Sequence, residues 1–143
     1  MKNKKYIIIG LLVGISLFSL KMFNDYREKS LDSIISYNST NFESLLVNFE
    51  LFTDNKGHAE DLSEFLSQYR VKKISKYEYE RERDLKETKG FHVFVNPQKG
   101  KTTMVFIYGD RLHRFDSSYY KVLNGPIDMD WVNDFINELE QEQ

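Results

Sequence analysis

The chain has 143 residues, of which 41% are hydrophobic and 15% aromatic, and none is cysteine. The lack of cysteine excludes a disulfide framework, thiol catalysis and lipid attachment at a cysteine. Six of the 20 basic and two of the 22 acidic residues precede residue 30, so the remaining 114 residues carry 14 basic and 20 acidic ones. This acidic balance argues against binding to a phosphate backbone, and no nucleic-acid partner is expected.

Residues 6–20, close to the N-terminus, form an apolar run without a charged residue. Three lysines stand directly in front of it: Lys2, Lys4 and Lys5. Lys21 interrupts the pattern, but its methylene stem lets the ammonium reach the headgroups. Residues 6–23 are therefore predicted to form a transmembrane signal anchor. The alternatives are a cleaved signal peptide, with its best cleavage site at residues 14–16, and a buried helix of a soluble protein.

The basic residues around the run predict its orientation. Lysines dominate before the run, whereas basic and acidic residues mix after it, so the N-terminus is expected in the cytoplasm. The predicted organisation is a cytoplasmic tail at 1–5, the anchor at 6–23, a stalk at 24–30 and an extracytoplasmic domain at 31–143. The expected partners are the lipid bilayer, through residues 6–23, and a membrane or surface protein.

The first part of the domain alternates between extended and helical patterns. Residues 33–37 favour a short strand, and residues 42–52 alternate with period two, which predicts a half-buried strand. Helical spacing fits residues 42–49 as well, so a helix there is the alternative. Residues 59–69 place apolar side chains on one face and acids on the other, which predicts an amphipathic helix.

The second part predicts a group of strands and a closing helix. Extended segments are expected at 71–79, 91–95, 102–108 and 111–115, of which the last three read as an antiparallel meander, and a looser stretch at 119–123. Asp128 is a suitable N-cap for an amphipathic helix that runs to about Glu140, with Trp131 at the centre of its packing. Because the strands are grouped, the fold class is α+β: a transmembrane helix, then one domain whose antiparallel sheet packs against two amphipathic helices.

The histidines offer the only pattern with some catalytic meaning. His92 and His113 fall in neighbouring predicted strands, and with Asp110 or Asp116 they would form a minimal metal site. Neither an HxxxH nor an HxH spacing supports such a site, and hydrolase and nucleotide-binding motifs are missing. We therefore expect no catalytic residue, no metal and no cofactor. The alternative is a cell-envelope hydrolase with its site around His92 and His113.

Tyrosines beside arginines suggest a binding surface, because tyrosine offers rigid contact area with a polar tip. The predicted binding residues are Tyr77, Tyr79, Arg81 and Arg83. The first two of these, together with Tyr119 and Tyr120, are expected to be exposed. The simpler interpretation is that these are ordinary tyrosines on the surface of a sheet. The mixed charge of residues 78–87 separately indicates a solvated hairpin tip or strand end.

The layout resembles small membrane-anchored extracytoplasmic proteins of Gram-positive bacteria, most of them uncharacterised. The resemblance is carried by the basic start and apolar run at 2–23, the helix at 59–69, the strand at 102–108 and the segment YYKVLNG at 119–125. It implies a location more than an activity. Lipid anchoring does not carry over, because the chain has no cysteine.

These patterns together predict a non-enzymatic, membrane-tethered module that binds a protein or peptide outside the cytoplasm. The apolar run predicts the tether, and the missing motifs argue against an enzyme. The excess of aromatic residues predicts a binding surface. The specific ligand is not encoded in any motif of the sequence.

Overall fold

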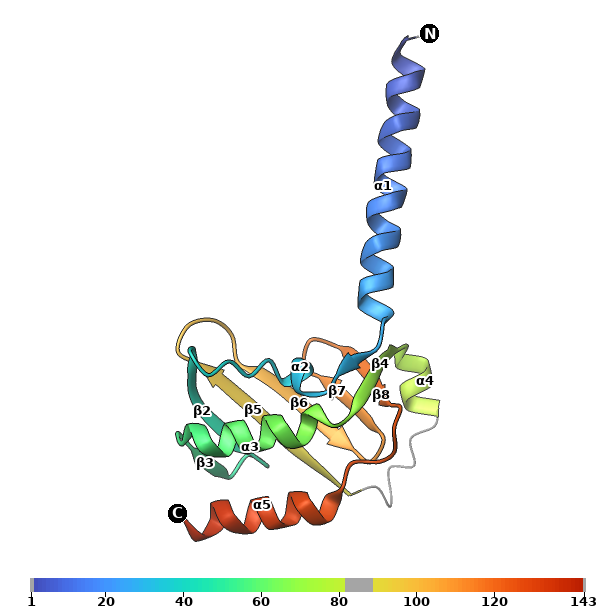
Figure 1. Ribbon diagram of the computed structural model, residues 1–143. Coiled ribbons are helices and arrows are strands. Elements are labelled where there is room, and N and C mark those ends of the chain that lie inside the picture. Colours follow the sequence, from blue (N-terminus) through green and yellow to red (C-terminus); the bar gives the residue numbers. More distant parts are fainter. Residues whose placement is uncertain (1, 82–88, 143) are drawn as a thin grey trace.

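The computed structural model describes residues 2–81 and 89–142. Its elements in chain order are α1 (Lys2–Tyr26), β1 (Lys29–Ser30), α2 (Asp32–Ile35), β2 (Phe42–Val47), β3 (Leu51–Thr53), α3 (Lys56–Ser67), β4 (Arg70–Ile74), α4 (Lys76–Arg81), β5 (Gly90–Pro97), β6 (Thr103–Tyr108), β7 (Arg111–Arg114), β8 (Ser118–Val122) and α5 (Met129–Gln141). The α+β class is confirmed: an apolar helix precedes an antiparallel sheet with helices (Figure 1).

Helix α1 is long and apolar enough to cross a membrane. The most apolar 18-residue window of its span Lys4–Tyr26 has a mean hydropathy of 2.1, and none of that window is buried. At 1.5 Å per residue this span measures about 35 Å, against a hydrocarbon core of about 30 Å. Figure 1 shows α1 projecting away from the sheet. The alternative of a buried helix is therefore wrong, whereas an anchor and a signal sequence both fit this helix.

The connection between α1 and the sheet is short. The helix continues to Tyr26, so the first residues of the segment 24–30 are helical. Lys29 and Ser30 then pair with β4 as the edge strand of the sheet. The Nζ atom of Lys73 lies 5.8 Å from the centroid of the Tyr26 ring. The predicted stalk is thus divided between the end of α1 and the first strand.

A single antiparallel sheet organises the rest of the described chain, with strand order β1-β4-β8-β7-β6-β5-β2-β3. The predicted meander is confirmed as β5, β6 and β7, with Phe91 opposite Ile107 and Ile107 opposite Leu112. The stretch expected to be loose, 119–123, instead forms most of β8 and pairs on both sides. Strand β8 lies between β4 and β7, so it links the meander to β4 in one continuous sheet.

Helices α3 and α5 lie on the same side of the sheet (Figure 1). They bury their apolar stripes with the inward residues of the central strands, and the predicted packing of two amphipathic helices is confirmed. Fully buried members of this core include Leu62, Leu66, Val93, Ile107, Leu112 and Leu139. The side chains of the opposite face alternate with these and include His92, Phe106 and His113, each half-buried.

Two predicted strands in the first half differ from the structure. Residues 33–37 do not form a strand, because Ile34 and Ile35 are both buried in the helical turn α2, which ends at Ser36 with a left-handed φ of 58°. Burial of two adjacent side chains here outweighs their β preference. Residues 42–52 form two strands instead of one, separated by a turn at Asn48 and Phe49, where φ is 53° and 65°. The helical alternative for this segment is wrong.

The extended segment predicted at 71–79 ends at Ile74. Ser75 then starts α4, because its side-chain oxygen accepts a hydrogen bond from the backbone N–H of Glu78 at 3.1 Å. An i,i+4 pair between Lys76 and Glu80, with Nζ and Oε1 3.6 Å apart, supports the short helix. The period-two alternation of Tyr77 and Tyr79 was therefore misleading.

Candidate functional site

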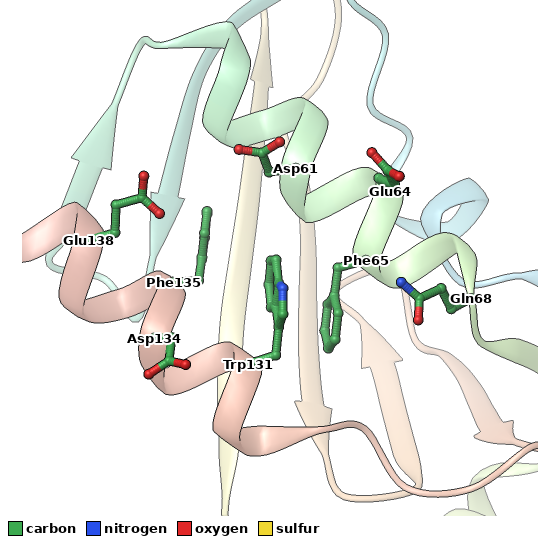
Figure 2. Close-up of a pocket in the computed structure, with 8 residues that line it drawn as sticks. All are labelled: Asp61, Glu64, Phe65, Gln68, Trp131, Asp134, Phe135 and Glu138. Carbon is green, nitrogen blue, oxygen red and sulfur yellow. The ribbon is translucent and has the colours of Figure 1, made fainter.

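A groove with a volume of about 370 Å³ runs between α3 and α5. Eight side chains line it: Asp61, Glu64 and Phe65 from α3, Gln68 at the C-cap of α3, and Trp131, Asp134, Phe135 and Glu138 from α5 (Figure 2). Each set of four follows the spacing i, i+3, i+4, i+7, which is one stripe along a helix. Two such stripes face each other because the helices lie side by side on one face of the sheet.

Caps at the helix starts fix the positions of these stripes. The side chain of Asn55 accepts a hydrogen bond from the N–H of Gly57 at 2.9 Å and so begins α3. Asp128 begins α5 as predicted, accepting from the N–H of Asp130 at 3.0 Å and of Trp131 at 3.3 Å. The N–H of Asp128 in turn donates to the hydroxyl of Tyr69, just beyond α3, at 2.9 Å. This bond ties the start of α5 to the end of α3.

Three aromatic rings form the floor of the groove. The rings of Phe65 and Trp131 are stacked at 3.8 Å with an angle of 5°, and those of Trp131 and Phe135 at 5.2 Å with an angle of 13°. Figure 2 shows the three rings standing parallel between the helices. Both phenylalanines are buried, whereas Trp131 is half-buried. Trp131 therefore lies at the rim of the core rather than at its centre, where the sequence had placed it.

Four carboxylates surround these rings. They belong to Asp61, Glu64, Asp134 and Glu138, and all four residues are exposed. The first three form no ion pair within the described parts of the chain, so no basic side chain there neutralises their charges. Like charges gathered along one groove raise the local concentration of cations. The groove is thus electrostatically suited to a positively charged ligand.

The chemistry of the groove favours a cation with an apolar stem. Each face of the Trp131 ring is covered by a neighbour, so a ligand meets mainly ring edges, which carry partial positive charge. Attraction of a cation must then come from the carboxylates and not from the ring faces. Methylene groups pack well against ring edges. Lysine and arginine combine such a stem with a charged head, whereas small inorganic ions would leave the aromatic part without a contact.

One group of three metal-ligating side chains occurs within the described parts of the chain, at the far end of α5. It consists of His58, Glu138 and Glu142. His58 is 4% exposed, and its position beside α5 is not visible in any local sequence spacing. The two glutamates have the i,i+4 spacing of one helix face.

The predicted histidine pair lies on the open face of the sheet. His92 stands opposite Phe106 on β6, and Phe106 stands opposite His113 on β7, so a phenylalanine lies between the imidazoles. Phe106 stacks on His113 at 4.7 Å and meets His92 edge-on at 5.0 Å. Each imidazole also hydrogen-bonds a tyrosine hydroxyl, His92 that of Tyr108 at 2.9 Å and His113 that of Tyr79 at 3.0 Å. Burial lowers the pKa of His92, which favours the neutral imidazole.

Of the predicted binding residues that the structure describes, only Tyr77 and Arg81 lie together on the surface. Tyr77 is 71% exposed, and the guanidinium carbon of Arg81 lies 5.8 Å from its ring centroid. Tyr79 is 2% exposed and packs against the ring of Tyr119 at 4.9 Å, so its expected exposure is wrong. The same holds for Tyr120, which is buried and faces the core, whereas Tyr119 is half-buried. Arg83 lies outside the described residues.

No protein-family model matches this chain, and comparisons with curated proteins and with solved structures give no significant match. The site must therefore be judged on its own geometry. The groove between α3 and α5 combines a cavity, an aromatic floor and four exposed carboxylates, three of which form no ion pair with any described residue.

Proposed function

We propose that the chain is a non-enzymatic, membrane-tethered module that holds a basic segment of a partner protein or peptide in the groove between α3 and α5. The observation that carries this proposal is the arrangement of four exposed carboxylates around the stacked rings of Phe65, Trp131 and Phe135. Lysine or arginine side chains would lay their stems along the ring edges and direct their charges to the carboxylates. The groove is preferred to the pair His92 and His113 because Phe106 separates these two imidazoles.

The tether and its orientation are part of the same proposal. Helix α1 remains in the bilayer as an uncleaved anchor, the residues before it lie in the cytoplasm, and the domain lies outside. The lysines in front of the apolar run support this orientation. The resemblance to anchored proteins of Gram-positive bacteria supports a bacterial cell membrane. A groove facing outward would meet basic segments of neighbouring membrane or surface proteins.

Labelling of single cysteines tests the orientation, because the natural chain has no cysteine. Asn3→Cys places a thiol before the anchor, and Lys101→Cys places one in the exposed loop between β5 and β6. In intact cells, a membrane-impermeant maleimide should label Lys101→Cys fully and Asn3→Cys only after the membrane is permeabilised. The reverse pattern would overturn the proposed orientation, and labelling of neither variant before permeabilisation would place the domain inside.

Calorimetric titration of the full chain in uncharged-lipid nanodiscs tests the ligand class. The probe is a soluble peptide of alternating lysine and alanine. The double variant Glu64→Gln with Asp134→Asn should bind it about three- to tenfold more weakly, because exposed ion pairs contribute about 0.2–1 kcal/mol each. Raising the salt from 50 to 500 mM should weaken binding to the natural chain as well.

A matched control removes the same total charge away from the groove. Glu43 and Glu140 are both exposed and do not line it. The variant Glu43→Gln with Glu140→Gln should therefore bind the peptide as the natural chain does. Equal weakening by both double variants would mean that only net charge matters. The proposal fails on that result, and also if the natural chain does not bind the peptide.

A further inference from the structure

The side chains of His58, Glu138 and Glu142 meet where the start of α3 lies beside the end of α5. The Nε2 atom of His58 is 3.9 Å from Oε1 of Glu138 and 3.4 Å from Oε2 of Glu142. His58 is 4% exposed, whereas the side chains of the two glutamates are 59% and 54% exposed. A fixed imidazole thus faces two carboxylates that can adjust their positions.

A second interaction holds the imidazole in place. The Nδ1 atom of His58 is 3.0 Å from Oγ1 of Thr53, and the N–H of Asn55 donates to the same oxygen at 3.1 Å. A hydroxyl oxygen can accept both bonds through its two lone pairs. When Nδ1–H donates to Thr53, the lone pair of the imidazole lies on Nε2, on the side of the carboxylates. Histidine ligands of metals are typically oriented through their other nitrogen in this way.

The distances fit a tetrahedral ion. Zinc binds imidazole nitrogen and carboxylate oxygen at about 2.0–2.2 Å, which separates two ligands of a tetrahedral site by about 3.4 Å. The distance from His58 to Glu142 already has this value, and that from His58 to Glu138 exceeds it by only half an ångström. Two carboxylates also neutralise the charge of a divalent ion.

We propose that His58, Glu138 and Glu142 bind one Zn²⁺ ion, which links the start of α3 to the end of α5. Imidazole favours zinc over magnesium, which prefers oxygen ligands in octahedral geometry. Three protein ligands leave a fourth position for water. The ion would hold the end of α5 against the start of α3 and so stabilise the packing of α5 on the domain. This site does not depend on the proposed peptide binding, although Glu138 borders both.

The test uses the full chain, purified without a histidine tag, stripped of metal with a chelator and placed in uncharged-lipid nanodiscs. Calorimetric titration with ZnCl₂ should give one ion per chain, and zinc should raise the melting temperature. Glu142→Gln removes one ligand without touching the groove and should weaken zinc binding at least about tenfold. Glu140→Gln, exposed on the same helix, should bind zinc as the natural chain does.

Three results would overturn the zinc site. They are a natural chain that binds no zinc, a Glu142→Gln variant that binds it unchanged, and MgCl₂ that raises the melting temperature as much as ZnCl₂ does. In each of these cases His58 would serve only as a polar contact between α3 and α5. Because Glu142 lies outside the groove, none of them bears on the binding of a basic peptide.

Discussion

Replacing Phe135 with alanine should lower the free energy of unfolding of the domain by about 3–5 kcal/mol, the usual cost of removing a buried phenylalanine. Phe135 is 5% exposed, stacks on Trp131 and meets the His58 ring edge-on at 6.3 Å. Its removal leaves a cavity under α5 that neither neighbour can fill. Urea unfolding of the full chain in detergent micelles, followed by circular dichroism, measures this loss.

Asn137 provides the control on the same helix. It is exposed, so Asn137→Ala should change the free energy of unfolding by no more than about 0.5 kcal/mol. Single domains are usually stable by only about 5–15 kcal/mol, so the Phe135→Ala loss would be a large share of the total. A loss below about 1 kcal/mol would mean that Phe135 and α5 do not pack against the sheet.

The double variant Leu12→Arg with Ile15→Arg should lose stable membrane association. Both side chains are exposed apolar groups near the middle of α1, and an arginine there costs about 2.5–3.5 kcal/mol. Two of them therefore oppose insertion by about 5–7 kcal/mol. Extraction of membranes with alkaline carbonate should leave the natural chain in the pellet and release the variant.

The control is Leu12→Ala with Ile15→Ala, which shortens the same side chains without adding charge and should stay in the pellet. Retention of the arginine variant in the pellet would contradict a spanning helix. Mass spectrometry of the natural chain tests the remaining alternative, because cleavage of a signal peptide at residues 14–16 would leave a mature chain without residues 1–16. The anchor proposal requires the residues of α1 to be present.

Sequence patterns predicted the parts of the fold in which local preference and burial agree. Residues 91–95 alternate and residues 102–108 have high β propensity, and the inward-facing side chains of both strands, such as Val93 and Ile107, are buried. Asp128 caps a helix whose apolar stripe faces the core. In these segments periodicity and turn residues point to the same structure.

Prediction failed where tertiary packing or a cap overrides the local pattern. Ile34 and Ile35 prefer a strand, yet a helical turn buries both of them at once. Tyr77 and Tyr79 alternate as in a strand, but the hydroxyl of Ser75 caps a helix that turns Tyr79 inward. Tyr79 finds its partner in His113, 34 residues away, which no local window could reveal.

The groove was missed for a related reason. Each helix shows its stripe in the sequence, because residues 61, 64, 65 and 68 repeat the spacing of residues 131, 134, 135 and 138. That identical spacing was the available signal. The sequence alone does not show that the two stripes face each other, since 62 residues lie between Gln68 and Trp131 and the strands formed by those residues set the arrangement. From the sequence alone, the acidic residues on these stripes indicate only that each helix has a solvent-exposed face.

The fluorescence of Trp131 tests the central claim most directly, because it is the only tryptophan in the chain and lies in the groove. Titration of the full chain in uncharged-lipid nanodiscs with the lysine–alanine peptide should change its emission saturably at low salt. The same peptide with glutamate in place of lysine should leave the emission unchanged. Binding of the basic peptide with no change in Trp131 emission, or an equal change with the acidic peptide, would contradict a groove that recognises basic segments.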